Sequence, residues 1–255
     1  MKFCLLGEKL SHSLSKVIHE EYMKLSYDLV ELKQDELVGF VNGVRGGTYS
    51  GFNITIPYKK AIIPLLDEVD DVAAEIGAVN TVVNRGGKLK GYNTDIFGMK
   101  YMLDEAGIDL KGKNVLILGM GGTSETSEVL AKREGAKDIK KVGRTSEINY
   151  GNCYELTDTQ VIINATPVGM YPHVGDKPID VKLFKNLEGV VDCIYNPYET
   201  LLIKESKELG LKGANGLGML VVQGLKAEEL WLDKPIDNRL IAPLTEYLKE
   251  KLREW

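Results

Sequence analysis

The stretch that most restricts the fold is a glycine-rich turn between an apolar segment and a helical one. Residues 113–118 form an apolar run suited to a buried parallel strand. Gly119, Gly121 and Gly122 follow, and residues 125–134 have the spacing of a helix. Glycines in such a turn let the backbone approach a pyrophosphate, while the helix N-terminus supplies amide donors. The pattern predicts an α/β fold with a nucleotide site at this turn.

Strands and helices continue to alternate after this turn. Strands are expected at residues 138–142, 160–163, 189–194 and 211–214, and helices at about 200–209, 219–231 and 238–253. In a dinucleotide fold, the end of the second strand contacts the adenosine ribose, where a carboxylate favours NAD and an arginine accommodates the 2′-phosphate of NADP. Arg144 and Thr145 occupy this position, and no carboxylate lies between Lys140 and Ser146. This predicts NADP(H), the alternative being a surface arginine in a turn.

The N-terminal part of the chain has a different pattern. It predicts strands at residues 2–6 and 27–32, helices after Ser15 and at 34–45, two short helical stretches separated by Pro64, and a hairpin at 79–83 and 88–92. Ser13 and Ser15 precede the first helix. They have two interpretations: a cap for the helix, or an anion site for a group such as a carboxylate.

Residues 52–56 alternate apolar and polar side chains. In a strand, this places the apolar residues, Ile56 included, on one face and Asn53 and Thr55 on the other, where they can face a cleft. The proline that follows ends the strand and suits the first turn of a helix, so Lys59 lies at a strand-to-helix corner, where α/β folds build sites. The alternative is an ordinary edge strand with a solvated lysine.

Asp95 begins the helix that follows the hairpin. A carboxylate at this position is ordinarily a helix cap. Asn80 stands at the start of the hairpin and is a further polar candidate for the site.

Composition excludes several classes of function. The chain has 255 residues, of which 44% are hydrophobic and 27% charged, as in globular proteins. Its net charge of −5 argues against a nucleic-acid or membrane partner, and no apolar run approaches the length of a membrane span. Cys4, Cys153 and Cys193 are isolated and the histidines are scattered, so no metal site is expected. We expect reduced thiols in a cytoplasmic protein.

Six motifs along nearly the whole chain resemble those of the shikimate dehydrogenase family, in the family's order. They are Ser11-His12-Ser13-Leu14-Ser15, Phe52-Asn53-Ile54-Thr55-Ile56-Pro57 with Lys59, Ile76-Gly77-Ala78-Val79-Asn80-Thr81, Gly91-Tyr92-Asn93-Thr94-Asp95, Asn164-Ala165-Thr166-Pro167, and Gly216-Leu217-Gly218-Met219 with Gln223. The chain departs from the family's usual pattern at Met120, where alanine is common, and at Gly143, where asparagine is common.

The resemblance implies an oxidoreductase that reversibly reduces 3-dehydroshikimate to shikimate with NADPH, in the shikimate pathway to chorismate and aromatic amino acids. It implies that Lys59 and Asp95 are catalytic. The implied substrate residues are Ser13, Ser15, Asn53, Thr55, Lys59, Asn80, Asp95, Tyr195 and Gln223. The implied cofactor residues are Gly119, Gly121, Gly122, Thr123, Arg144, Thr145, Thr166, Gly216 and Met219.

The change of pattern after residue 112 predicts two domains. Residues 1–98 and 218–255 are expected to form a mixed-sheet substrate domain, and residues 99–217 a Rossmann-like NADP-binding domain with a parallel sheet, in a monomer or homodimer. The alternative within the family is a quinate/shikimate dehydrogenase with broader substrate or NAD use. Outside it, the alternatives are a non-catalytic nucleotide-binding protein and a methyltransferase, and neither explains why Lys59 and Asp95 occur together.

Overall fold

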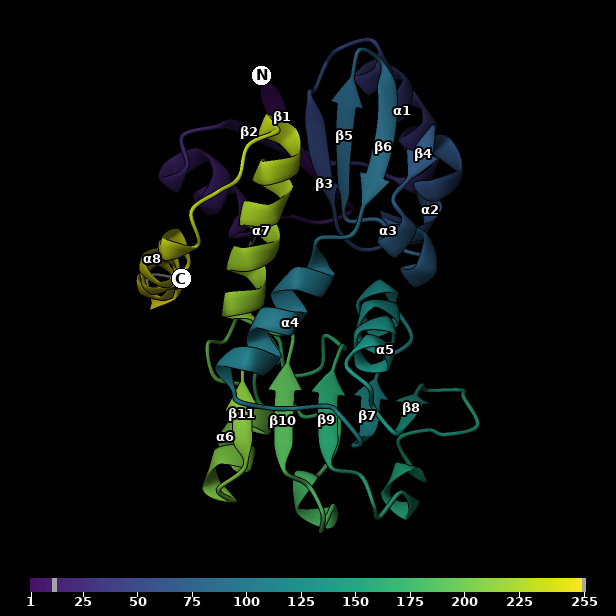
Figure 1. Cartoon of the computed structure of the whole chain (residues 1–255), viewed down its shortest axis with the longest axis vertical. Helices are drawn as coiled ribbons and strands as arrows, with labels where there is room; N and C mark the ends of the chain where they lie inside the picture. Colours follow the sequence, from purple (N-terminus) through teal and green to yellow (C-terminus); the bar gives the residue numbers. More distant parts are fainter. Residues whose placement is uncertain (11–12, 254–255) are drawn as a thin grey trace. The chain divides into compact units, whose positions relative to one another are not determined.

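The computed structural model describes residues 1–10 and 13–253, so the motif residues Ser11 and His12 lie outside the described part. It confirms the predicted α/β class, with one mixed and one parallel sheet (Figure 1). The chain divides into two compact units. The first unit comprises Met1–Asp95 and Val221–Leu248, and the second comprises Ile96–Leu220 and the residues from Lys249 onward. Which unit holds the substrate and which the cofactor remains a prediction.

The first unit is built on a six-stranded mixed sheet in the order β2-β1-β3-β5-β6-β4. Its strands are β1 (Lys2–Gly7), β2 (Ser26–Glu31), β3 (Gly51–Ile54), β4 (Glu68–Val69), β5 (Thr81–Arg85) and β6 (Lys88–Tyr92). β1 pairs in parallel with β2 and β3, whereas β5 is antiparallel to β3 and β6. The antiparallel pairs include the predicted hairpin, and they make this sheet mixed.

Short helices surround this sheet. They are the π-helix η1 (Val17–Tyr22), η2 (Gln34–Glu36), α1 (Leu37–Arg45), α2 (Tyr58–Ala61), η3 (Ile63–Leu65), α3 (Asp71–Ile76), η6 (Asn238–Leu240) and most of α8 (Ile241–Arg253). Alternate residues of β1 serve the two faces of the sheet. Cys4 and Leu6 join a core cluster with α1, while Phe3 and Leu5 join a cluster with α7 (Leu217–Leu232). Burial on both faces explains the continuous apolar run of this strand.

The C-terminal half of α7 closes one face of the first sheet. Trp231 stacks on Phe3 with 4.6 Å between ring centroids, and its Nε1 donates to the Val82 carbonyl oxygen at 3.0 Å. A Cβ at Gly51 would lie 2.5 Å from the Trp231 ring, so glycine is required there for close packing. On the same helix, Glu228 Oε1 lies 2.6 Å from Nδ1 of His19 on η1, and both side chains are fully buried. These contacts join the N-terminal strand and η1 to a helix made late in the chain.

The prediction for residues 52–56 is partly wrong. β3 ends at Ile54, and Ile56 is 70% exposed instead of sharing the face of Phe52. The strand stops because the chain turns: Tyr58 N donates to the Thr55 carbonyl oxygen at 3.0 Å, which starts the first turn of α2. The edge-strand alternative is also wrong, since β3 lies between β1 and β5.

The prediction for the segment around Pro64 is wrong as well. Pro64 does not separate two helical stretches but lies inside η3, where the first turn needs no amide donor from it. The chain then forms the two-residue strand β4 before α3. Pairing of β4 with β6 defines this strand, and a contact between distant segments has no local signature in the sequence.

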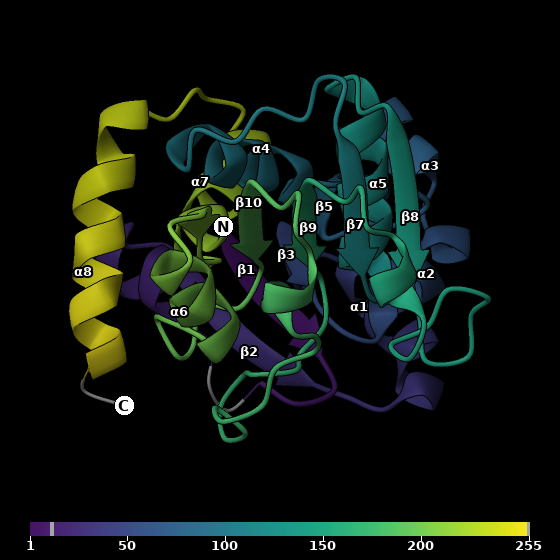
Figure 2. The ribbon, with the colours of Figure 1, turned by 90° about the horizontal axis from the view of Figure 1, so that it is seen from below.

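The second unit contains a five-stranded sheet in the order β11-β10-β9-β7-β8, in which every pair is parallel (Figure 1). Figure 2 shows β10, β9, β7 and β8 of this sheet from below. The strands are β7 (Asn114–Leu118), β8 (Asp138–Val142), β9 (Val161–Asn164), β10 (Gly189–Asp192) and β11 (Lys212–Ala214). The other elements are α4 (Asp95–Glu105), α5 (Gly122–Arg133), η4 (Cys153–Glu155), η5 (Val181–Leu183) and α6 (Leu201–Glu208). The predicted alternation and parallel sheet are confirmed.

A buried carboxyl group joins two strands and a helix in the second unit. Asp192, fully buried at the end of β10, accepts hydrogen bonds from Asn164 Nδ2 at 3.0 Å, Ile194 N at 3.1 Å and Thr200 Oγ1 at 2.7 Å. Thr200 in turn caps α6. Burial raises the pKa of Asp192 to about 6, and the hydrogen bonds oppose this rise.

Candidate active site

The structure brings Lys59 and Asp95 together in the first unit. Lys59 lies on α2, directly after the turn that ends β3, and Asp95 is the first residue of α4. Lys59 Nζ is 2.6 Å from Asp95 Oδ2, and the two side chains are only 15% and 7% exposed. Partial burial weakens solvent screening, so the carboxylate holds the ammonium group in a defined direction. Asp95 therefore does more than begin a helix.

Asn80 connects this ion pair to the neighbouring strands. Its Nδ2 donates to Asp95 Oδ1 at 2.8 Å, and its Oδ1 accepts from Thr94 N at 2.7 Å and Thr81 Oγ1 at 3.1 Å. Because a backbone N–H can only donate, the Thr94 amide fixes which end of the Asn80 amide faces Asp95. Gln223 Oε1, on α7, lies 3.5 Å from Asn80 Nδ2. Sequence reasoning did not assign a role to the two threonines, although both lie at the ends of the predicted hairpin.

Asn53 and Thr55 lie on the other side of β3 from the core cluster of α1. The Asn53 amide is engaged within the protein, accepting from Tyr27 OH at 2.7 Å and donating to Thr81 Oγ1 at 3.0 Å. Thr55 is half-buried just past the end of β3, and its N donates to the Leu6 carbonyl oxygen at 2.9 Å. Tyr27 carries no signal in the sequence that distinguishes it from an ordinary core tyrosine.

Only Ser13 of the two candidate serines makes a contact of the capping kind. No side chain caps η1 itself, but Ser15 and Lys16 before it are already helical, and Ser13 Oγ accepts from Ser15 N at 3.3 Å. Ser13 N donates to the Leu10 carbonyl oxygen at 3.1 Å, which ties the serine segment to the end of β1. Ser15 is 8% exposed, whereas Ser13 is half-buried. The cap interpretation is therefore supported for Ser13, and the anion site remains a prediction.

In the second unit, the glycine turn leads from β7 into α5 as predicted. Gly119 has φ +111°, and a Cβ there would lie 3.1 Å from the Ala165 carbonyl oxygen, so a side chain would strain the turn. Gly121 is the N-cap of α5, which no side chain caps, and a Cβ at Gly121 would meet no atom within 4 Å. An open approach to an uncapped helix N-terminus fits a pyrophosphate. Ser124, at the third glycine position, donates to the Gly119 carbonyl oxygen at 2.7 Å.

Arg144 and Thr145 are exposed directly beyond β8. Within residues 1–10 and 13–253, Arg144 makes no hydrogen bond or ion pair, so its guanidinium is available to a ligand. The preceding Gly143 packs tightly: a Cβ there would lie 2.2 Å from Ser146 Oγ and 2.8 Å from Met120 Cγ. Met120 and Gly143, which both depart from the family pattern, thus lie against each other and bring the Arg144 loop close to the glycine turn.

The remaining predicted residues of this unit have different surroundings. Thr166 Oγ1 donates to Asn164 Oδ1 at 2.7 Å beyond β9, and Tyr195 is half-buried beyond β10. Gly216 admits no side chain, because a Cβ would lie 2.1 Å from the Cys193 carbonyl oxygen. Met219 is 7% exposed, and its carbonyl oxygen would lie 2.4 Å from a Cβ at Gly98, so this residue packs α7 against α4.

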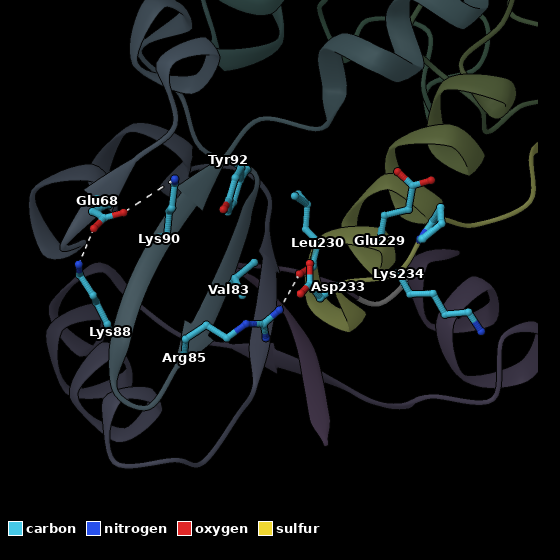
Figure 3. Close-up of a pocket in the computed structure, with 11 residues that line it drawn as sticks. Glu68, Val83, Arg85, Lys88, Lys90, Tyr92, Glu229, Leu230, Asp233 and Lys234 are labelled. Atoms are coloured by element: carbon cyan, nitrogen blue, oxygen red, sulfur yellow. Dashed lines mark hydrogen bonds and ion pairs between the residues drawn. The ribbon is translucent and has the colours of Figure 1, made fainter.

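A separate surface pocket of about 530 Å³ lies in the first unit (Figure 3). None of the predicted site residues is among those that line it, which are Glu68, Val83, Arg85, Lys88, Lys90, Tyr92, Glu229, Leu230, Asp233, Lys234 and Pro235. Its charges are largely satisfied within the protein. Glu68 pairs with Lys88 and Lys90, and Arg85 donates to the carbonyl oxygens of Leu230 at 3.0 Å and Trp231 at 3.1 Å. The candidate catalytic residues Lys59 and Asp95 are not part of it.

Within the described residues, no group of three His, Cys, Asp or Glu side chains is arranged to hold a metal ion, and no helix is long and apolar enough to cross a membrane. None of the three cysteines forms a disulfide bond.

Comparison with known proteins identifies the family. Residues 5–82 match the family model described as the shikimate dehydrogenase substrate binding domain. The NADP(+) shikimate dehydrogenase of Clostridium perfringens is 37% identical, over 97% of this chain and 98% of that relative. The chain belongs to the shikimate dehydrogenase family.

Solved structures agree with this membership in the shikimate dehydrogenase family. Shikimate dehydrogenase 1 of Peptoclostridium difficile is 35% identical, with a TM-score of 0.91 over 99% of each chain. The Thermus thermophilus enzyme, solved in complex with NADP(H) and shikimate, is 31% identical, with a TM-score of 0.85 over 100% of this chain and 99% of that one. The recognition made from the six motifs is confirmed.

Proposed function

We propose that this chain is an NADP-dependent shikimate dehydrogenase, which reversibly reduces 3-dehydroshikimate to shikimate. The observation that carries the proposal is the partly buried Lys59–Asp95 pair, with 2.6 Å between Nζ and Oδ2, in a chain 37% identical to an NADP(+) shikimate dehydrogenase. Membership of the family places the reaction in the shikimate pathway to aromatic amino acids.

Lys59 and Asp95 supply the acid–base chemistry that this reaction needs. NADPH, when bound, supplies the hydride. The oxygen of the reduced carbon then needs a proton, and Lys59 Nζ donates it; in the reverse direction, Lys59 accepts it. Asp95 holds Nζ in place through Oδ2, while Asn80 holds Oδ1 at 2.8 Å. With both oxygens engaged, the carboxylate cannot rotate away from the lysine.

Polar side chains of the first unit are suited to the rest of the substrate. Thr55, Asn80 and Gln223 offer hydrogen bonds to ring hydroxyls, and the hydroxyls of Ser13 and Ser15 suit the carboxylate. Asn53 contributes mainly by holding Thr81, since its amide is already engaged at both ends. Tyr195 of the second unit remains a proposed contact to the substrate carboxylate.

The second unit has the residues to hold NADP(H). The glycine turn and the uncapped N-terminus of α5 suit the pyrophosphate, with Thr123 on the first turn of the helix. The other proposed contacts are Thr166 on the loop after β9, Gly216 on the loop after β11, and Met219 on the first turn of α7. Arg144, with Thr145 beside it, suits the 2′-phosphate, because a guanidinium forms charge-assisted hydrogen bonds to phosphate.

Arg144→Ala tests the proposed choice of cofactor. We expect the KM for NADP to rise about 10- to 100-fold, because a charge-assisted contact contributes roughly 1.5–3 kcal/mol. The KM for NAD, which has no 2′-phosphate, should hardly change. Steady-state kinetics of shikimate oxidation with each cofactor measure both values, and NAD serves as the internal control. An equal loss with the two cofactors would show that Arg144 supports the fold instead.

The function itself is tested by following NADPH absorbance when shikimate is added with NADP. We expect turnover with shikimate and NADP to exceed turnover with quinate and with NAD. Greater turnover with quinate or NAD would favour the broader quinate/shikimate dehydrogenase, and absence of turnover in all four combinations would exclude the proposal.

We also propose a monomer or homodimer in the cytoplasm. The net charge of −5 and the absence of disulfide bonds among the three cysteines support this, and size-exclusion chromatography measures the oligomeric state.

A further inference from the structure

Two segments proposed to bind substrate meet at Gly7, the last residue of β1. Gly7 is buried, and a Cβ built on it would lie 2.7 Å from Thr55 Cγ2 and 2.6 Å from Leu10 Cδ2. Thr55 follows β3, the parallel neighbour of β1, whereas Leu10 leads into the serine segment because its carbonyl oxygen accepts from Ser13 N. Gly7 does not have a positive φ, so its backbone conformation is open to any residue and the lack of a side chain must serve packing.

The position of Thr55 Cγ2 against Gly7 determines the direction of the Thr55 hydroxyl. The Thr55 backbone is held on both sides, by its N–H to the Leu6 carbonyl oxygen at 2.9 Å and by its own carbonyl oxygen, which accepts from Tyr58 N at 3.0 Å. With this backbone fixed, Cγ2 can move away from a new atom only by rotation about χ1. In a β-branched residue, that rotation moves Oγ1 to another staggered position, about 120° away.

A Cβ at residue 7 would affect Leu10 in a different way. It has two rotatable side-chain bonds, so its terminal methyl group can move without its backbone. It is also 4% exposed, and its N–H donates to Glu31 Oε1 at 2.5 Å, so this movement takes place inside a packed core. The contact with Leu10 therefore affects mainly stability, and the contact with Thr55 affects where a hydroxyl points.

We propose that Gly7 is a positioning residue for substrate recognition: by leaving room for Thr55 Cγ2, it holds the Thr55 hydroxyl toward the substrate. This inference rests on the proposed function, because it assigns that hydroxyl to a substrate contact. Gly7 itself does not touch the substrate, and its effect passes entirely through Thr55.

The test is a double-mutant cycle of Gly7→Ala with Thr55→Ser, which removes Cγ2 and keeps the hydroxyl. Gly7→Ala alone should raise the KM for shikimate about 3- to 10-fold, the effect of one lost hydrogen bond, and change kcat less than about twofold. In the Thr55→Ser background, the same substitution should change the KM less than about twofold. The matched control is Gly39→Ala on α1, where a Cβ would meet no atom within 4 Å, and which should leave the KM unchanged.

Two results would overturn the proposal. The first is an equal rise of KM on Gly7→Ala in both backgrounds, which would show that the effect does not pass through Cγ2. The second is an unchanged KM on Thr55→Val, which would show that the hydroxyl makes no substrate contact. Turnover by the wild-type chain tests the proposed function separately. If wild-type turnover is absent, thermal unfolding of the wild type, the two single variants and the double variant of this cycle decides. Gly7→Ala should lower Tm less in the Thr55→Ser background, and an equal drop of Tm in both backgrounds contradicts the packing argument.

Discussion

Lys59→Ala is expected to lower kcat for shikimate oxidation by at least about 100-fold, since loss of general acid–base catalysis typically costs about 100- to 10,000-fold. The KM for shikimate should change only modestly, because Asn80, Thr55 and the serines remain. Stopped-flow or steady-state NADPH absorbance measures both quantities. The physical reason is that no other amine pairs with Asp95 in the described part of the first unit to transfer the proton in its place.

Lys60→Ala is the matched control for this prediction. Lys60 is the next residue of α2 and is exposed, and side chains of adjacent helical residues diverge by about 100°. Its replacement should leave kcat within about twofold of wild type. If Lys59→Ala instead kept near-normal kcat while shikimate binding collapsed, Lys59 would be a substrate anchor and the proton would have to come from Asp95 or water.

At neutral pH, the buried Asp192 is expected to lower the free energy of unfolding by about 3 kcal/mol, because its pKa rises by roughly two units on folding. A carboxyl group with a raised folded pKa binds its proton more tightly in the folded state. Its contribution to stability is therefore greatest below the ordinary value of 3.8 and falls as pH rises through the folded value of about 6.

Comparison with Asp192→Asn isolates this contribution from all other groups that titrate. The amide has nearly the same shape as the protonated carboxyl group, can accept from Asn164 and Ile194, and does not ionise. Urea unfolding at a series of pH values from about 4 to 7.5 should show the variant gaining stability relative to wild type by about 2–3 kcal/mol across that range. A difference that does not vary with pH would mean that Asp192 does not change its ionisation on folding.

The features that could be predicted from the sequence were those encoded by neighbouring residues. The glycine turn at Gly119, the strand before it and the helix after it are set by local apolar spacing and by backbone requirements, and the structure has all three. Strand β4 was missed because only its pairing with β6 defines it. The prediction that Ile56 shares the face of Phe52 was wrong because the chain turns early, with a hydrogen bond between Tyr58 N and the Thr55 carbonyl oxygen. Hydrophobic periodicity describes one helix or strand at a time, so it cannot predict pairing between distant strands or a turn closed by a backbone hydrogen bond.

The candidate site divides in the same way. Lys59 and Asp95 could be placed at element ends from their local sequence, and the family motifs linked them. The groups that hold them could not all be found by pattern: Thr94 acts on Asn80 through its backbone N–H, which every residue except proline carries. That role does not depend on a side-chain type that a motif could specify, so it needed the folded arrangement.

The discontinuous makeup of the first unit has a consequence for the order of events during synthesis. A ribosome makes β1 before the second unit and the Trp231 end of α7 after it. Almost all of the second unit lies between them as one continuous segment, Ile96–Leu220. The second unit can thus complete its parallel sheet on the nascent chain before Trp231 is available to stack on Phe3 and before Glu228 is available to pair with His19. The domain that begins first is the one that must finish last.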